Sequence, residues 1–196
     1  VFQMKKHINE IINVSNEIYN KGLVSGKAGN ISKRIKASTG DIVAITPTLK
    51  SLSDLREEDI VLVDMDGNLL TKGKPSSEVG MHLEIYKKRD DVNAIVHTHS
   101  TYATGFAFSN KNLKRLEGFG EIKNPYVASI EYAKPGTVEL AKNAGEDIKN
   151  EDVLILKNHG VICVSDDLNE AKLLAVFVEE SAKTQFVTYM LNSVED

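Results

Sequence analysis

Two histidines at alternate positions could share one metal ion. His97 and His99 follow the apolar run Ala94-Ile95-Val96, which predicts a buried strand over residues 92–99. Alternate side chains of a strand point to the same face, so the two imidazoles lie together with their Cα atoms roughly 6.6 Å apart, while Thr98 points away. Two buried histidines that bond backbone carbonyls are the alternative. The paired spacing favours metal binding over it.

A third imidazole, His159, also follows a buried apolar strand, and Gly160 after it would let the backbone turn away from an ion. Neutral imidazoles suit zinc and other late divalent metals. Three protein nitrogens leave a position open for substrate, as in catalytic sites. His7, in an amphipathic helix, and His82, on the inner face of another, are expected to be structural.

Glu78 begins a predicted helix, where the helix dipole alone favours a carboxylate. Ser76 and Ser77 precede it after Pro75, and two hydroxyls beside helix N-terminal amides suit a phosphate dianion. Simple capping by serine explains the same residues without any ligand. From the residues alone both explanations stay open.

Alternating helices and strands must position these side chains. Helices are predicted over 5–21 and 137–148, from Pro75 onward and from Asp167 onward; strands over 41–46, 60–64, 92–99, 153–157 and 161–164, with 68–71 as a returning hairpin arm. The glycine-rich residues 22–30 are expected to form a loop with exposed amides that leads into extended segments. No repeat or linker is apparent, so we expect one α/β domain over 1–196, with Met4 as the natural start and residues 1–3 a remnant.

Composition excludes several classes of function. The 196 residues carry 24 Lys and Arg against 28 Asp and Glu, a net charge of −4, and the pI is near 5.8. Binding to nucleic acid or to an anionic membrane needs clustered positive charge, so neither partner is expected. The apolar runs are too short to span a bilayer. The one cysteine, Cys163, is expected to be a buried thiol in a cytoplasmic protein.

An ordered set of motifs makes the chain resemble the class II sugar-phosphate aldolases, the superfamily of L-fuculose-1-phosphate aldolases and L-ribulose-5-phosphate 4-epimerases, and above all its fuculose-phosphate branch. The resemblance runs from about Ile8 to Tyr189, and the set is far more specific than any one motif. The motifs are Gly29-Asn30-Ile31-Ser32, Thr46-Pro47-Thr48, Pro75-Ser76-Ser77-Glu78, His97-Thr98-His99, Tyr132-Ala133-Lys134-Pro135-Gly136-Thr137 and Asn158-His159-Gly160.

The resemblance implies a three-layer α/β/α domain around a mainly antiparallel sheet, and a homotetramer with active sites between subunits. It implies one Zn2+ per subunit, held by His97, His99 and His159. Glu78 would be the fourth ligand of the resting enzyme and the acid/base once substrate displaces it. The positions matching the family's phosphate site are Gly29, Asn30, Thr48, Ser76 and Ser77.

Within the superfamily, Ser77 and Glu78 favour an aldolase over the dehydratases and epimerases. Two departures stand out. Leu49 follows Thr48 where the family usually has a phosphate-binding glycine, and Lys50 could compensate by its charge. The family's aldehyde-protonating tyrosine is missing near Gly118-Phe119, with Tyr126 the nearest candidate, which leaves open an aldehyde other than that of fuculose phosphate.

The leading hypothesis is zinc-dependent, reversible aldol cleavage of a phosphorylated sugar, a ketose 1-phosphate, to dihydroxyacetone phosphate and an aldehyde. The metal would act as a Lewis acid while Glu78 moves the C3 proton. The alternatives are an epimerase or dehydratase on the same scaffold, or a non-catalytic domain in which the histidines hold a structural metal.

Overall fold

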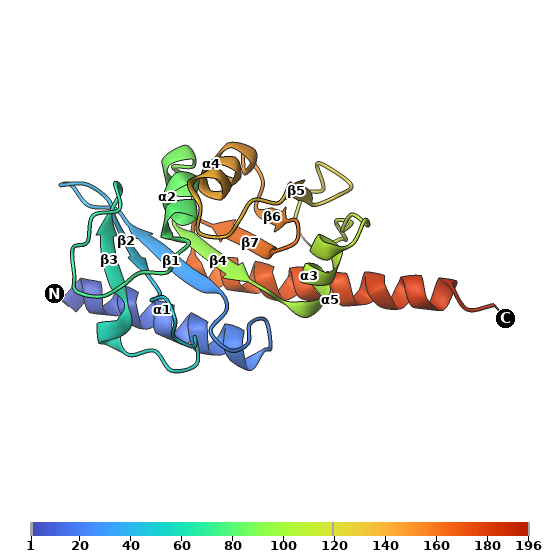
Figure 1. Ribbon diagram of the computed structural model, residues 1–196, viewed down its shortest axis with the longest axis horizontal. Coiled ribbons are helices and arrows are strands. Elements are labelled where there is room, and N and C mark those ends of the chain that lie inside the picture. Colours follow the sequence, from blue (N-terminus) through green and yellow to red (C-terminus); the bar gives the residue numbers. More distant parts are fainter. Residues whose placement is uncertain (1, 119, 196) are drawn as a thin grey trace.

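The computed structural model describes residues 2–118 and 120–195 and is built around a seven-stranded sheet with helices on both faces (Figure 1). The strand order is β3-β2-β1-β4-β7-β6-β5, and β5–β6 is the parallel pair while the other neighbours are antiparallel. The strands are β1 (Asn30–Ile35), β2 (Ile42–Ile45), β3 (Val61–Asp64), β4 (Ala94–Thr98), β5 (Ala128–Ile130), β6 (Val153–Leu156) and β7 (Gly160–Ser165).

The helices form the two outer layers. They are α1 (Phe2–Asn20), α2 (Val79–Lys88), α3 (Thr101–Phe108), α4 (Val138–Asp147) and α5 (Leu168–Asn192), with a short 3-10 turn η1 (Glu57–Asp59). Helices α2 and α4 cover one face of the sheet, and α1, α3 and α5 cover the other (Figure 1). The expected three-layer α/β/α fold with a mainly antiparallel sheet is confirmed.

The sheet separates two hydrophobic cores, as the alternation of strand side chains requires. Ile95 of β4 packs with the α2 and α4 side, whereas Ala94 and Val96 pack with the opposite side. Thr137 caps α4 by accepting a hydrogen bond from Leu140 N at 3.3 Å, and Asp167 caps α5 by accepting one from Glu170 N at 3.0 Å. These caps confirm the predicted starts of both helices.

Several elements differ from expectation. Helix α3, the turn η1 and strand β5 were not predicted, and β1 was expected only as an extended segment. Residues 68–71 do not form a strand; Leu69 makes an isolated bridge to Val63, and Leu70 N donates to Leu62 O at 2.8 Å. The returning arm is therefore a short turn that covers the edge strand β3.

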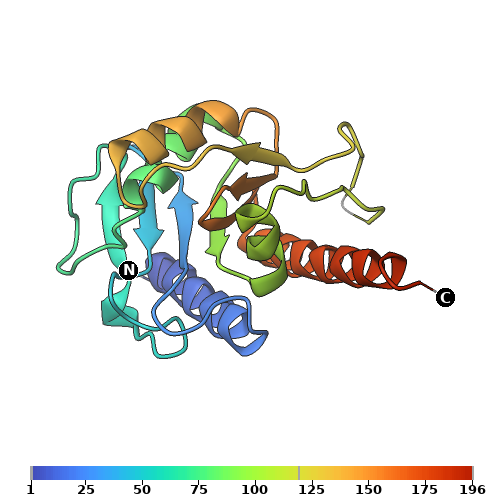
Figure 2. The ribbon, with the colours of Figure 1, turned by 45° about the vertical axis from the view of Figure 1, so that its right-hand side comes forward.

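The last turns of α5 extend past the sheet (Figure 2). They carry exposed apolar side chains, namely Val187, Met190 and Leu191. Among the described residues, no helix is both long enough and apolar enough to cross a bilayer.

Candidate metal centre and active site

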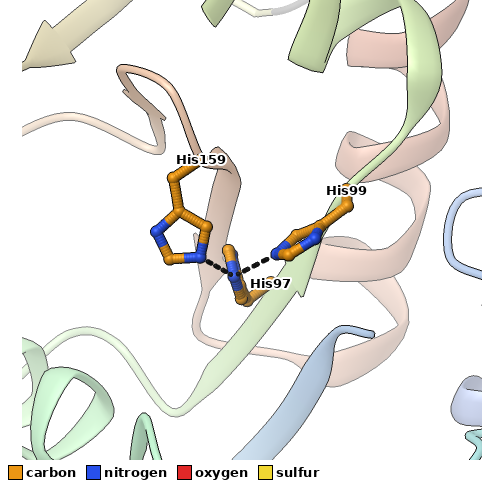
Figure 3. A group of neighbouring side chains, drawn as sticks. All are labelled: His97, His99 and His159. Carbon is orange, nitrogen blue, oxygen red and sulfur yellow. Dashed lines mark hydrogen bonds between the residues drawn. The ribbon is translucent and has the colours of Figure 1, made fainter. Parts of the chain in front are cut away.

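The site lies at one end of the central strands β1, β4 and β7. Antiparallel pairing there brings together strand ends from distant parts of the sequence. His97 is near the end of β4, opposite Asn30 at the start of β1 and Ile162 near the start of β7. The turn between β6 and β7 contributes His159, and His99 follows β4 directly. We call His97, His99 and His159 the histidine cluster (Figure 3).

The ring nitrogens of the histidine cluster converge on one point. His97 Nε2 lies 3.1 Å from His99 Nε2 and 3.1 Å from His159 Nε2. His97 Nδ1 lies 2.9 Å from Val161 O. Because a carbonyl only accepts, Nδ1 carries the proton and the Nε2 lone pair of neutral His97 faces the centre. Figure 3 shows the three rings around that centre.

This donor set fits a tetrahedral cation. Zinc–nitrogen bonds of ~2.0–2.1 Å place tetrahedral ligand atoms roughly 3.3 Å apart, close to the 3.1 Å that separates His97 Nε2 from each of the other two ring nitrogens. Burial, and the charges of His97 and His159, lower the pKa of His99 to about 4, so this ring is neutral and its lone pair is available. The predicted gathering of the three histidines is confirmed; the identity of an ion stays a prediction.

Glu78 supplies a fourth donor from the start of α2. Its Oε2 lies 3.1 Å from His97 Nε2 and its Oε1 lies 3.1 Å from His159 Nε2. Its carboxylate makes no capping hydrogen bond, although Glu78 occupies the N-cap position. Burial acts to raise the pKa of Glu78, but His97 and His159 together hold it below its ordinary value. The Glu78 side chain therefore contacts the histidine cluster and does not cap the helix.

The contact between Glu78 and His97 also changes the pKa of His97. Burial alone would lower the pKa of the His97 imidazole, but the Glu78 carboxylate outweighs burial and raises that pKa. Without a cation, the Glu78 carboxylate thus favours the protonated form of His97.

Two backbone features hold the β6–β7 turn in place. Asn158 has a φ of +55°, a left-handed conformation in which asparagine is among the better-tolerated residues. The left-handed turn thus falls on Asn158 rather than on Gly160. The lack of a side chain at Gly160 instead permits close packing, because a Cβ there would lie 2.9 Å from His99 Cδ2 and 3.3 Å from His97 Cε1.

The expected phosphate-site residues lie on three segments near Glu78. Gly29 has a φ of +82°, and a Cβ there would meet Val24 Cγ1 at 2.5 Å. The Asn30 side chain turns inward, with Nδ2 donating to Glu78 Oε2 at 2.9 Å. Ser76 is buried and its Oγ accepts from Glu78 N at 3.2 Å, whereas Ser77 is exposed.

The segment after Thr48 bears on one departure from the family pattern. Thr48 N donates to Lys74 O, which ties this loop to the one before Pro75. Leu49 adopts a φ of +60° with 72% of its surface exposed, a conformation that favours glycine. Lys50 pairs with Asp59 at 2.5 Å, so its charge is partly engaged.

A cleft of about 380 Å³ between α2 and α4 includes Ser77 and Glu78 in its lining. Gly136, from the motif 132–137, has a φ of +77° and approaches Ser77 so closely that a Cβ would lie 3.3 Å from Ser77 O. That motif therefore shapes the loop that carries the two serines.

Tyr126 lies in an exposed segment and forms an isolated bridge with Lys114. No contact between Tyr126 and the histidine cluster is found among the described residues, and Phe119 lies outside them. The proposed replacement of the family tyrosine by Tyr126 stays a prediction.

Sequence reasoning did not foresee the buried polar contacts of His82. The ring is completely buried and contacts Asn30 Oδ1 through Nε2 and Ser32 Oγ through Nδ1. A usable signal existed, because Glu78, His82 and Tyr86 are spaced by four residues and so share one face of α2.

Comparison with known proteins identifies the family. The profile described as Class II Aldolase and Adducin N-terminal domain matches residues 9–186. The chain belongs to this family. It is 39% identical to the L-fuculose phosphate aldolase of Methanococcus maripaludis strain S2, covering 96% of this chain and 99% of the relative. It is 33% identical to the 5-deoxy-D-ribulose 1-phosphate aldolase of Bacillus thuringiensis, covering 94% and 86%.

A solved structure of an L-fuculose 1-phosphate aldolase superimposes with a TM-score of 0.88 at 31% identity, covering 97% of this chain and 91% of that chain. The resemblance seen in the motifs is thereby confirmed, and so is the expectation of an enzyme of the class II aldolase type. The relatives differ in the sugar phosphate that their names give.

Proposed function

We propose that this class II aldolase catalyses zinc-dependent, reversible cleavage of a ketose 1-phosphate to dihydroxyacetone phosphate and an aldehyde. The observation that carries the proposal is the convergence of three imidazole nitrogens and the Glu78 carboxylate at distances of 3.1 Å. His97, His99 and His159 would hold the ion, with Glu78 as the fourth ligand before substrate binds. When bound, the cation supplies Lewis-acid polarisation of the substrate's oxygens.

Glu78 performs the proton transfer in this proposal. In the cleavage direction the C3–C4 bond breaks, the Glu78 carboxylate takes the proton of the C4 hydroxyl as the aldehyde forms, and a proton is then delivered to C3 to give dihydroxyacetone phosphate. Glu78 gives the C3 proton in this direction and takes it in condensation. Its burial supports this role, because water excluded from the site during the chemical step does not compete with Glu78 for the substrate's proton.

The phosphate would sit among the backbone of Gly29 and Asn30, the hydroxyls of Thr48 and Ser76, and Ser77. The support is local: Gly29 has a left-handed backbone without a side chain, and exposed Ser77 lines the cleft beside Glu78. Such concave groups of amides and hydroxyls suit a dianion.

Assembly as a homotetramer in the cytoplasm, with active sites between subunits, is part of the proposal. The exposed apolar side chains on the last turns of α5 support association with further copies of the chain. Sedimentation analysis would test it, and a monomer at micromolar concentration would contradict it.

The decisive experiment is release of dihydroxyacetone phosphate from a panel that includes L-fuculose 1-phosphate and 5-deoxy-D-ribulose 1-phosphate. These substrates follow the names of the relatives and separate a hydroxylated from a deoxygenated aldehyde. We expect turnover that a chelator abolishes and zinc restores. Cleavage insensitive to the chelator would overturn the metal role.

The same assay distinguishes the alternatives. Conversion of a sugar phosphate without loss of carbon–carbon bonds would indicate an epimerase or dehydratase. Absence of turnover, with a large loss of folded protein after metal removal, would indicate a structural metal domain.

A further inference from the structure

A continuous row of hydrogen bonds leads from Tyr86 to Glu78. Tyr86 Oη lies 2.7 Å from Ser32 Oγ, and Ser32 Oγ lies 2.6 Å from His82 Nδ1. His82 Nε2 lies 2.5 Å from Asn30 Oδ1, and Asn30 Nδ2 donates to Glu78 Oε2 at 2.9 Å. All five residues are buried. We call this row the Tyr86–Glu78 chain.

The direction of every bond in this chain follows from its end. A carboxylate only accepts, so Asn30 must turn its NH2 group to Glu78 and its carbonyl oxygen to His82. That oxygen also only accepts, so His82 carries its proton on Nε2. His82 Nδ1 then accepts from the Ser32 hydroxyl, and Ser32 Oγ accepts from Tyr86.

We propose that His82 is a positioning residue that acts through Asn30 to hold the Glu78 carboxylate for proton transfer. This inference rests on the proposed function of Glu78. Asn30 can rotate its amide by half a turn, and such a rotation would set its carbonyl oxygen against the carboxylate. The donor on His82 Nε2 prevents that rotation.

The chain also makes the two oxygens of Glu78 unequal. Oε2 accepts from Asn30, whereas the polar contact of Oε1 is His159 Nε2 at 3.1 Å, a nitrogen that would bind the ion rather than donate in the proposed zinc enzyme. With zinc bound, Oε1 would then be the oxygen without a hydrogen-bond donor and so the more basic of the two. Oε1 is therefore the atom that exchanges the C3 proton.

The environment keeps His82 in one form. Burial, and the charge of His97, lower the pKa of His82 to about 3, while the Glu78 carboxylate opposes this shift. The ring is thus neutral across the working pH range, with one donor and one acceptor.

Two substitutions at one position separate positioning from packing. The amide nitrogen of His82→Gln can occupy the place of Nε2 and still donate to Asn30. The shorter His82→Asn reaches Ser32 but not Asn30. Ile85→Ala serves as the control for general destabilisation, because Ile85 is a buried core residue of α2 that is not a member of the Tyr86–Glu78 chain.

The readout is exchange of the C3 proton of dihydroxyacetone phosphate with deuterium, measured together with zinc content. We expect His82→Asn to retain zinc and to keep a similar KM for dihydroxyacetone phosphate. The kcat of its proton exchange should fall roughly 10–100-fold, because misplacement of a catalytic group by about 1 Å costs about that much. His82→Gln should stay within about threefold of the wild type, and Ile85→Ala should lower Tm without this loss. Equal kcat in His82→Asn and His82→Gln would overturn the proposal.

A second measurement does not depend on activity. Nitrogen-15 NMR of the wild-type protein should show His82 as the Nε2–H form. A proton on Nδ1 would refute the hydrogen-bond directions of the Tyr86–Glu78 chain, and with them the proposal. Absence of proton exchange in the wild type, with the Nε2–H form present, would refute the proposed function while leaving the hydrogen-bond chain intact.

Discussion

Gly160 packs against the backbone of Thr98 so closely that a Cβ on Gly160 would lie 2.5 Å from the Thr98 carbonyl oxygen. Real Cβ atoms do not approach a backbone oxygen so closely, so one strand must move if Gly160 gains a side chain. The affected strand ends are those that carry His97 and His159.

Gly160→Ala should therefore damage the metal centre more than the fold. We expect a loss of ~1–3 kcal/mol in the free energy of unfolding, which is typical of overpacking, together with a fall of at least tenfold in zinc affinity. Gly105→Ala in α3, where an added Cβ meets nothing within 4 Å, is the matched control. Unchanged zinc affinity in Gly160→Ala would show that the turn relaxes without moving the rings.

His97→Ala, His99→Ala and His159→Ala should each lose metal and turnover while remaining folded. The reason is that two extensive hydrophobic cores stabilise the chain independently of an ion. Mass spectrometry of bound zinc and circular dichroism test this expectation. Stoichiometric metal in any one variant would remove that histidine from the ligand set.

Glu78→Gln separates proton transfer from metal binding. The amide cannot take the C3 proton, so turnover should fall roughly 10²–10⁴-fold while the histidine cluster still holds zinc. Exchange of the dihydroxyacetone phosphate proton isolates this step without an aldehyde. Exchange at the wild-type rate in the metal-loaded variant would rule out Glu78 as the base.

Zinc affinity should fall as the pH falls. The Glu78 carboxylate raises the pKa of His97, so below that pKa zinc must displace a proton from the ring. Each displaced proton lowers the apparent affinity about tenfold per pH unit. Titration of zinc against a competing chelator at several pH values tests this dependence, and a flat profile from pH 5 to 8 would contradict it.

Leu49→Gly should not destabilise the chain, although removal of a large side chain usually does. Leu49 has a left-handed φ of +60°, and glycine adopts this conformation without the ~1–2 kcal/mol of strain that a leucine carries. This gain offsets the ~0.5–1 kcal/mol of extra conformational entropy that a glycine loses on folding. Leu70→Gly, a half-exposed leucine without that backbone conformation, should cost stability. Urea denaturation of both variants measures the difference.

The histidine cluster was predictable because its signal is local. His97 and His99 are two residues apart on one strand, and His159 follows another apolar strand. Strands and amphipathic helices likewise leave periodic patterns in the sequence.

What was not predictable depends on distant contacts. Helix α3 has no apolar stripe and contains Gly105; its first turn is held by Glu179 of α5, which accepts from Ala103 N at 2.9 Å across 76 residues. Strand β5 has three residues and, among the described strands, pairs with β6 alone. The Tyr86–Glu78 chain joins α2 to β1 through Ser32 and Asn30, which lie about 50 residues from their partners. Spacing shows that the α2 members of this row share one face of the helix, but it does not show which residues of β1 they meet.

The placement of the donors at the ends of β1, β4 and β7 has a kinetic consequence. His97 and His159 are 62 residues apart, and Asn30 and Glu78 are 48 apart. Long loops must close before these pairs meet, and contacts of this kind slow folding. The zinc-binding geometry should thus arise only after the central strands β1, β4 and β7 have paired. Uptake of zinc during refolding would therefore mark a late step on the folding pathway.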